Sequence, residues 1–347
     1  FILRRTVVML FTALCLTFIV FFMTNLYPNL EKLAKSEGNF RMDDAAVQTM
    51  LSNRGYLQPL PVKYGQWLGV LPGYVIEGTD DKTRRRCQLP AMALALEDVP
   101  KFCGILQGYW GYSTVFKAEV SSIIATRLSL TAKLMFWVML LMVPSALLVG
   151  VFAGMREGSR TDRTLSTFAI TTTATPEYVS GVIFIAIFSS SAFGLKWFKG
   201  TATKAMEDAN LENFLLPVIT IALYGMGYIA RMTRASMAEV MTAQYIRTAR
   251  LKGVSFRNIV VKHALRNALI APFTVIMLQF PWLLNGVVIV ETLFNYKGFG
   301  WVLVQAAGNN DIELLLGVSV VSVIVVLVTQ LISDIGYVYL NPRIKVT

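Results

Sequence analysis

The sequence predicts an all-α membrane protein with six transmembrane helices and a long extracytoplasmic segment between the first and second of them. Hydrophobic side chains make up 55% of the 347 residues and charged ones only 15%. This composition is far more apolar than that of a soluble domain. Several apolar runs reach about 20 residues, enough to cross a hydrocarbon core. Basic residues also gather in the segments expected on one side of the membrane, as they do in multi-pass proteins.

The six predicted spans follow the apolar runs along the chain. They cover residues 6–27, 130–154, 165–188, 214–229, 268–291 and 314–337. The first run follows two arginines and could be mistaken for a cleaved signal peptide. It is longer than a signal core and no small-residue cleavage site follows it, so we expect a retained span. The domains are then a first helix (1–27), an outer subdomain (28–128), a five-helix core (129–340) with an inside loop at 231–267, and a tail (341–347).

The positions of Lys and Arg set the orientation. With the N-terminus in the cytoplasm, the inside segments hold fifteen basic residues against three acidic ones. The outer segment 28–126 is nearly balanced, with eleven basic and ten acidic residues. Both termini are therefore expected in the cytoplasm. The net charge of +11 then reflects topology beside membrane lipid, and no nucleic-acid partner is needed to explain it.

The outer segment is too long for a plain connector. Short helices are expected at 45–51, 60–68 and 92–107, and the charged stretch 75–86 is expected to be exposed. Cys87 and Cys103 both lie in this segment, where an oxidising compartment would let a disulfide persist. Two free thiols are the alternative.

Several kinds of chemistry are excluded. A single histidine rules out a His-Glu-x-x-His zinc site, and the chain has no P-loop, Gly-x-Ser-x-Gly or Cys-x-x-Cys motif. We expect no catalytic residue, no metal site and no cofactor in this chain. Acids inside spans are few, and such groups are costly in a membrane and kept for function. Glu177, Tyr178 and Glu291 are the candidates for lining a translocation path. For Glu177, a hydrogen bond to neighbouring helices is an equal alternative.

The inside segment 231–267 must form structure of its own. Residues 236–248 have apolar side chains at helical spacing, and Leu251, Lys252 and Gly253 provide an end. A basic last turn suits the helix dipole, and glycine supplies the left-handed position after the helix. A second amphipathic helix is expected at 254–264, so the segment forms a helix–glycine–helix elbow. A lipid-surface role would suit such a basic elbow too.

The residues of this elbow carry a family resemblance. YIRTARLKG at 245–253, followed by HALRNA at 263–268, resembles the cytoplasmic "EAA" loop of ABC importer permeases. More narrowly, it is similar to the B-type membrane subunit of the dipeptide/oligopeptide/nickel family, where Arg-Thr-Ala stands for Glu-Ala-Ala. ARMTRASM at 230–237, VIVETLFNYKGFG at 288–300 and the end of the chain resemble the same family. The resemblance covers nearly the whole chain outside an insertion at about 73–107.

Two positions depart from the family pattern. Asn341 stands where aspartate is usual, and Glu177 with Tyr178 stands where Ser-Phe is more usual. The second departure leaves the lining of the path, and with it the solute, open among dipeptides, longer peptides, nickel chelates, opines and sugars.

The resemblance implies a type I ABC importer fold in a bacterial inner membrane. The elbow would be the coupling helix that seats in a groove of an ATPase subunit. Its expected contact residues are Tyr245, Arg247, Thr248, Ala249, Arg250, Lys252 and Gly253. The implied partners are a second, homologous permease in a heterodimer, two ABC ATPases that hold ATP and Mg, and a periplasmic substrate-binding protein.

The chief alternative is an ion-coupled secondary transporter. Such a fold predicts paired, broken helices near the membrane midplane, whereas the interruptions noted in the spans are Pro144 and Pro176. A structural or signalling membrane protein would leave the elbow unexplained.

Overall fold

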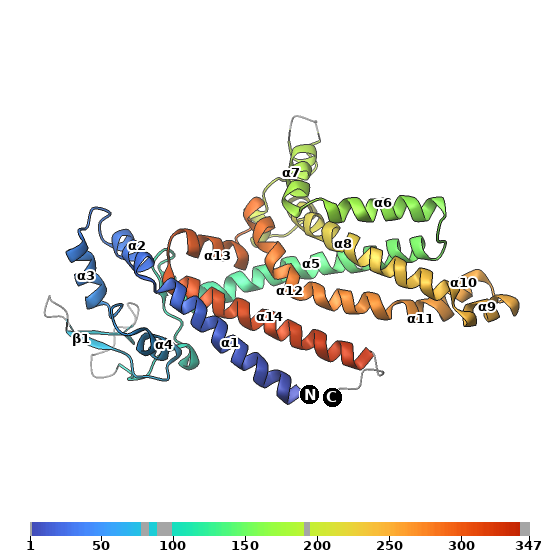
Figure 1. The fold of residues 1–347 in the computed structure, drawn as a ribbon. Helices are drawn as coiled ribbons and strands as arrows, with labels where there is room; N and C mark the ends of the chain where they lie inside the picture. The colour runs from blue at the N-terminus through green and yellow to red at the C-terminus, as the bar shows by residue number, and fades with distance from the viewer. Residues whose placement is uncertain (1, 78–82, 89–98, 191–194, 341–347) are drawn as a thin grey trace. The chain divides into compact units, whose positions relative to one another are not determined.

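The computed structural model describes residues 2–77, 83–88, 99–190 and 195–340 (Figure 1). The tail 341–347, with Asn341, lies outside the described residues. The long helices are α1 (Ile2–Thr24), α5 (Val120–Gly154), α8 (Leu211–Thr242), α12 (Ile270–Leu293) and α14 (Ile312–Leu340). The chain forms two compact units. One is Ser129–Trp301 with Phe1–Arg5 and Val325–Thr347, and the other is Thr6–Leu128 with Val302–Ile324.

The described helices account for the predicted spans. Four single helices are long and apolar enough to cross a membrane: Arg4–Thr24, Val120–Gly154, Leu211–Thr242 and Ile312–Gly336. Two bent pairs pass the same test together, Arg160–Ala174 with Glu177–Phe188 and Phe256–Ala268 with Ile270–Phe280. If each pair is one span, the described residues hold the six predicted spans.

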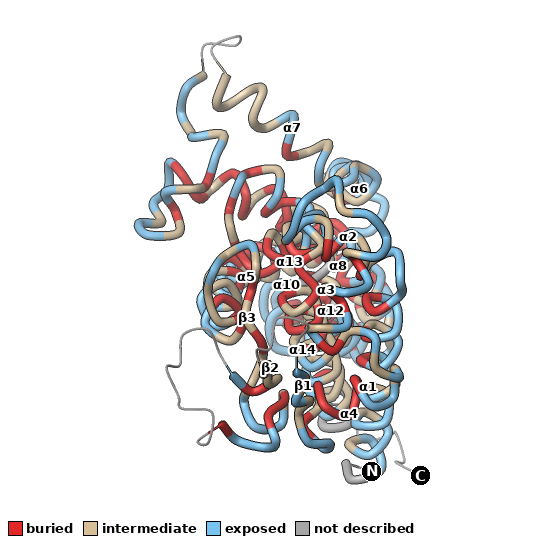
Figure 2. The backbone as a smooth tube through the Cα atoms, turned by 90° about the vertical axis from the view of Figure 1, so that its left-hand side faces the viewer, coloured by how far each residue is buried: buried red, intermediate tan, exposed pale blue. Residues whose placement is uncertain are grey.

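The third predicted span is divided into α6 (Arg160–Ala174) and α7 (Glu177–Phe188), which meet at 103°. Proline lacks an amide hydrogen and pushes the preceding residue out of the helical region. Thr175, before Pro176, accordingly has an extended backbone with φ −92° and ψ 117°. The structure describes all of α7, and Gly181 is its one buried residue, so the helix is drawn mostly tan and pale blue in Figure 2.

Helix α8 is longer than the predicted span because it continues into the inside segment. A capping box opens it: the Asn210 side chain accepts from the Asn213 amide, and the Asn213 side chain accepts in return from the Asn210 amide. The helix then runs without a break to Thr242, so the helix expected at 236–248 begins as the last turns of α8.

In the unit of Thr6–Leu128 and Val302–Ile324, the predicted helices 45–51 and 60–68 are confirmed as α3 (Asp44–Asn53) and α4 (Leu60–Leu68). Helix α2 (Tyr27–Glu37) was missed, although Pro28 at its start is a usual opening for a helix. Of the predicted helix 92–107, residues 92–98 lie outside the described part, and the remainder holds only the short turn η1 (Ile105–Gln107).

Two small antiparallel hairpins complete this unit. Strand β1 (Val75–Glu77) pairs with β2 (Thr83–Arg85) in the register Val75 with Arg85, so part of the charged stretch is a ribbon. Strand β3 (Tyr112–Ser113) pairs with β4 (Ala118–Glu119), which leads directly into α5. Beyond them, α13 (Phe299–Gly308) precedes α14.

Each unit has its own apolar core. In the unit of 6–128 and 302–324, Phe21, Tyr64 and Trp67 pack ring against ring, with centroids 5.3 to 5.7 Å apart. The buried Lys63 ammonium lies beside them and donates to Asn25 Oδ1 and to the Tyr56 carbonyl, both at 2.9 Å. In the other unit, α5, α8 and α12 contribute buried residues such as Met142, Ile221 and Leu283 to one core.

Candidate functional site

The predicted elbow is a compact substructure built from α9 to α11 (Figure 1). Its elements are α9 (Gln244–Leu251), α10 (Phe256–Asn258), the π-helical turn η4 (Ile259–Ala264) and α11 (Leu265–Ala268). Ala243, with φ −62° and ψ 147°, separates α8 from α9 and redirects the chain. The second helix was expected at 254–264 and in fact runs from Phe256 to Ala268, with a π-helical middle.

A buried apolar cluster holds the elbow against the end of α8. Ile246 of α9 is fully buried between Met237 and Met241 of α8 and Ile259 of η4. The Ser236 hydroxyl adds a hydrogen bond of 2.8 Å to the Ala268 carbonyl. The elbow is therefore packed on a base of its own and is more than a solvated loop.

The glycine bend has the predicted conformation. Gly253 has φ +74°, and its amide donates to the Arg250 carbonyl at 3.0 Å. The next amide, of Val254, donates to the Ala249 carbonyl at 3.1 Å. This pair of hydrogen bonds is the Schellman motif. Ala249 and Val254 supply the apolar contact that usually accompanies the motif, since both pack on the buried cluster of the elbow.

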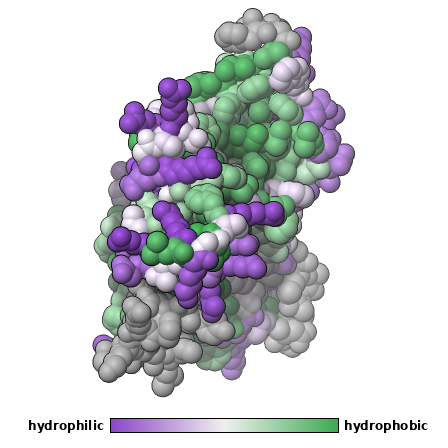
Figure 3. All heavy atoms as spheres, turned by 90° about the vertical axis from the view of Figure 1, so that its right-hand side faces the viewer, coloured by the Kyte–Doolittle hydropathy of each residue, from purple (hydrophilic) through white to green (hydrophobic). Residues whose placement is uncertain are grey.

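The expected contact residues divide into two groups. Arg247, Thr248, Arg250 and Lys252 are exposed, and hydrophilic side chains gather on the face that α9 to α11 occupy (Figure 3). Ala249 instead packs partly into the elbow's own cluster. The Tyr245 side chain is 41% exposed, and its hydroxyl accepts a 2.9 Å hydrogen bond from Asn267.

Leu251 is a functional candidate that the sequence reading did not single out. It is 82% exposed at the end of α9, between Arg250 and Lys252. A single exposed leucine is common on protein surfaces, so what makes Leu251 a candidate is its position at the tip of a well-packed substructure, among basic side chains. The sequence did contain a signal for this exposure: Leu251 lies in the last turn of the helix, on a different face from the buried Ile246.

A second set of contacts joins α6 to α8 above the elbow. Arg234 donates to both oxygens of Asp162, at 2.6 and 2.8 Å, in a bidentate ion pair. The Gly158 amide and the Ser166 hydroxyl also donate to this carboxylate, at 2.9 and 3.0 Å. The Asp162 residue is only 3% exposed, so this pair fixes where α6 begins. Sequence reading missed it, although Asp162 was one of three acids in a basic compartment.

Glu177 and Tyr178 lie at the bend between α6 and α7. Glu177 is half-buried in the first turn of α7, where a carboxylate is favoured by the helix dipole. Tyr178 is 52% exposed. Both side chains can therefore face a path or a partner.

Glu291 has a different environment from the one expected of a path residue. It is completely buried, and its carboxyl contacts the Thr131 hydroxyl. Its other oxygen accepts from the Trp301 amide at 2.9 Å, while the Thr131 hydroxyl accepts from the Phe299 amide at 2.7 Å. Together these groups cap the start of α13, so the geometry favours a structural role for Glu291 over the path-lining role predicted from the sequence.

In the outer segment the structure joins Cys87 to Cys103, with their Cα atoms 5.6 Å apart. Both residues are buried and pack with Val99 and Tyr109. Among the described residues, no group of three His, Cys, Asp or Glu side chains could hold a metal ion.

Comparison with known proteins supplies the context for this geometry. Residues 146–346 match the family model described as binding-protein-dependent transport system inner membrane component. The chain belongs to this family. It is thus an ABC transporter permease, a multi-pass inner-membrane protein, and its all-α fold with bent and straight spans agrees with the predicted fold class.

Relatives extend the match beyond the family model. The permease is 33% identical to a probable peptide ABC transporter permease of Sinorhizobium fredii over 70% of its length and 77% of the relative. It is 33% identical to the oligopeptide transport system permease AppB of Bacillus subtilis, again over 70% and 77%. A putative peptide permease of Brucella ovis is 28% identical over 99% of the chain and 98% of its own length.

A solved structure described as an amino acid ABC transporter with histidines matches 62% of the permease and 94% of its own chain. The identity is 14% and the TM-score 0.46.

Proposed function

We propose that this permease is the transmembrane subunit of an ATP-driven importer that moves peptides, or a related small solute, from periplasm to cytoplasm. Family membership and the names of its relatives support the class of transporter and of solute. The observation that carries the coupling part of the proposal is the elbow, a rigidly packed substructure whose tip is basic and carries an exposed leucine.

In this proposal α9 seats on a cytoplasmic ATPase subunit. Leu251 is the apolar anchor, and Arg247, Arg250 and Lys252 pair with acidic groups around it. Such rim charges contribute orientation and rate of association more than affinity. ATP and Mg are held by the partner, since this chain has no P-loop of its own.

The contacts around the elbow suggest how movement passes to the spans. Ile246 and the Ser236 hydrogen bond join the elbow to α8, and the Arg234–Asp162 pair joins α8 to α6. Closure of two ATPases would displace the elbow, and α8 and α6 would follow it because Ile246 is fully buried and the Arg234–Asp162 pair is bidentate. Glu177 and Tyr178, at the bend of the third span, are the side chains that we propose to line the path.

The complete importer would contain a second, homologous permease, two ATPases and a periplasmic binding protein, with both termini of this chain in the cytoplasm. One elbow can occupy only one ATPase, so two permeases are needed for two ATPases. Native mass spectrometry of the complex, purified gently through a tag on this chain, should show the heterodimer. A complex with two copies of this chain and no second permease would contradict it.

Reconstitution tests the coupling. In proteoliposomes that contain the importer and its binding protein, uptake of a labelled peptide should require ATP inside the cytoplasmic-facing compartment. Leu251→Asp should reduce uptake at least tenfold and weaken recovery of the ATPase. Leu211→Asp changes a leucine that is 73% exposed at the start of α8, the end of that helix away from the elbow, and should affect neither. Uptake driven by an ion gradient without ATP would establish the secondary-transporter alternative instead.

A further inference from the structure

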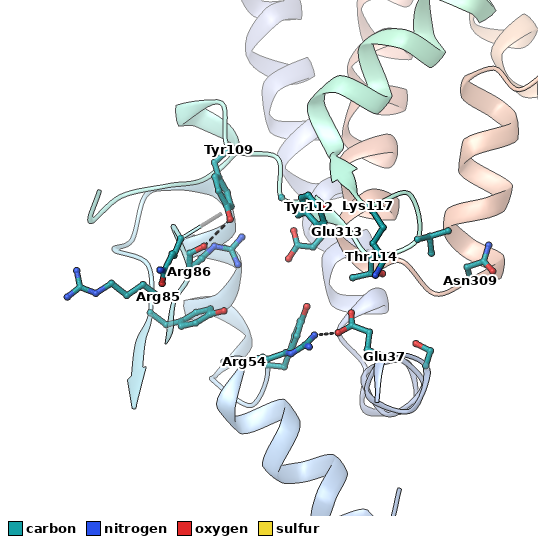
Figure 4. A pocket seen from close by; sticks show the side chains of 16 residues that line it. Glu37, Arg54, Arg85, Arg86, Tyr109, Tyr112, Thr114, Lys117, Asn309 and Glu313 are labelled. Carbon is teal, nitrogen blue, oxygen red and sulfur yellow. Dashed lines mark hydrogen bonds and ion pairs between the residues drawn. The ribbon is translucent and has the colours of Figure 1, made fainter. Parts of the chain in front are cut away.

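A polar cavity of about 710 Å³ opens within the unit of Thr6–Leu128 and Val302–Ile324. This volume falls in the range of about 300 to 1,000 Å³ that sites for small ligands occupy. Its walls come from the ends of α2 and α3, from the hairpin β1–β2 with the residues after it, from β3, and from the facing ends of α13 and α14 (Figure 4). Part of the wall therefore belongs to the insertion at 73–107.

The walls are held by contacts that fix their positions. The disulfide between Cys87 and Cys103 anchors the insertion next to Arg86, and the Tyr109 hydroxyl donates to the Arg86 carbonyl at 3.0 Å. On the other side, Asp311 accepts from the Ser113 hydroxyl at 2.6 Å and from the Leu314 amide at 3.2 Å, joining the β3 turn to the start of α14. These contacts hold the walls of the cavity in place within this unit.

Two cavity-lining side chains of opposite charge each have one buried atom without a hydrogen-bond partner among the described residues. The Nε atom of Arg86 and the Oε2 atom of Glu313 are both buried, and neither has a hydrogen-bond partner within the part of the chain that the structure describes. Figure 4 shows the two side chains on different walls of the same cavity. By contrast, Arg54 is satisfied by an ion pair with Glu37. The charges of Arg86 and Glu313 act on each other, but these two atoms have no hydrogen bond to any described residue. Buried polar atoms are nearly always hydrogen-bonded in folded proteins, so the two atoms mark the place of a missing hydrogen-bond partner.

The remaining lining suits a ligand that accepts hydrogen bonds and carries negative charge at one end. Burial, reinforced by the negative charge of Glu313, raises the pKa of Tyr109 to about 12. Burial likewise raises the pKa of Tyr56. Both phenols therefore stay protonated at neutral pH. The Tyr109 proton is already donated to the Arg86 carbonyl, so the Tyr56 hydroxyl is the donor that remains for a ligand. Lys117 stands exposed on the same lining, on a backbone with φ 53°.

We infer that this cavity binds a short peptide by its free termini, with the α-carboxylate at Arg86 and the α-ammonium at Glu313. The inference rests on the proposed peptide substrate and adds a second place where the importer meets it, in the outer unit of the permease itself. A ligand of one sign would pair only one of the two buried groups. A zwitterion satisfies both and leaves the lining without a net change of charge.

The experiment measures binding of tri-alanine to the permease–ATPase complex in nanodiscs, without the binding protein, by calorimetry. N-acetyl-tri-alanine and tri-alanine amide, which each lack one terminal charge, are the matched ligands. Tri-alanine should bind at least tenfold more tightly than either blocked peptide. Arg86→Gln should lower the affinity for tri-alanine at least tenfold and leave that for the amide unchanged. Glu313→Gln should lower the affinity for tri-alanine at least tenfold and leave the affinity for N-acetyl-tri-alanine unchanged.

Matched controls guard against a general loss of structure. Arg41→Gln and Glu207→Gln remove exposed charges that do not line the cavity, and they should leave all three affinities unchanged. Arg86→Lys keeps the positive charge and should retain part of the affinity for tri-alanine, which a merely structural role of the guanidinium would not give.

Three outcomes would overturn the inference. The first is that tri-alanine does not bind to the wild-type complex. The second is that both cavity variants bind tri-alanine as tightly as the wild type does. The third is that the variants weaken only the docking of the binding protein. The last result would assign the cavity to a protein partner. ATP-driven uptake is measured separately, so failure of the cavity and failure of the importer function give different results: uptake without cavity binding refutes only this inference, and cavity binding without uptake refutes only the proposed function.

Discussion

Replacement of Gly253 by valine tests whether the bend of the elbow transmits energy from an ATPase. Gly253 has φ +74°, a region where an L-residue pays a steric cost of about 1–2 kcal/mol and a β-branched one is a marked outlier. An added Cβ would meet no atom within 4 Å. The cost is therefore almost purely conformational, and we expect about 2 kcal/mol for valine.

This cost should shift the elbow away from its Schellman-closed form. Since each 1.4 kcal/mol is a factor of ten, a 2 kcal/mol penalty lowers the relative population of the closed elbow about 25-fold. Because the base of the elbow is held separately by Ile246 and Ser236, insertion and assembly should survive. Peptide uptake by proteoliposomes should fall at least tenfold, while the amount of assembled complex stays near that of the wild type.

Two variants separate the bend from general strain. Gly253→Asn should keep most of the uptake, because asparagine tolerates the left-handed region. Gly108→Val introduces the same strain at φ +81°, also in open space, but in the outer unit, after η1. It should lower uptake much less. Normal uptake by Gly253→Val, or an equal loss in Gly108→Val, would refute the reasoning.

Three further predictions concern stability. Asp162→Asn replaces the buried carboxylate partner of Arg234 by a neutral amide and leaves Glu157, 3.8 Å away, as the charged partner. It should lower the free energy of unfolding by about 2 kcal/mol. In a double-mutant cycle with Arg234→Gln, additive effects would show that the pair does not interact. Mass spectrometry of non-reduced peptides should find Cys87 joined to Cys103, and the bridge over about 15 residues should stabilise the insertion by roughly 3 kcal/mol; free thiols in exported protein would contradict this. Burial lowers the pKa of Lys63 below 10.5, so the unfolded chain binds more protons than the folded one between that lowered value and 10.5. The melting temperature of the wild type should therefore rise relative to that of Lys63→Met as the pH approaches 10.5, and parallel curves would show that this lysine does not titrate differently on folding.

Local rules in the sequence were enough for the membrane helices and for the Gly253 bend. A run of apolar residues must be helical in a bilayer, since every backbone group has to be paired within the segment. The sequence Leu251-Lys252-Gly253 ends a helix by backbone geometry alone, because glycine is the residue that enters the left-handed region without cost. Both features depend on neighbours in the chain, so no distant contact was needed to predict them.

Periodicity was a weaker guide where distant residues compete. The spacing of apolar residues at 236–249 is continuous, yet the helix breaks at Ala243 because Ile246 and Met241 are both drawn into one cluster with Ile259. The same pattern could not separate Ala249, which packs inward, from Leu251, which is exposed. The direction of a side chain at a kink is decided by what lies beneath it.

The sequence by itself determined that this chain is a multi-pass membrane protein and which stretch resembles a coupling loop, because composition and short motifs are local properties. The side of the membrane on which its basic segments lie stays a prediction. Only the tertiary structure decided that Glu291 is a buried cap for α13, that Asp162 is held by Arg234, and that Arg86 and Glu313 share one cavity. The members of these sets lie between about 10 and 230 positions apart in the chain. Contacts at such separations depend on how the helices pack. The identity of an acidic residue does not reveal whether its carboxylate lines a path, caps a helix or faces an arginine across a cavity.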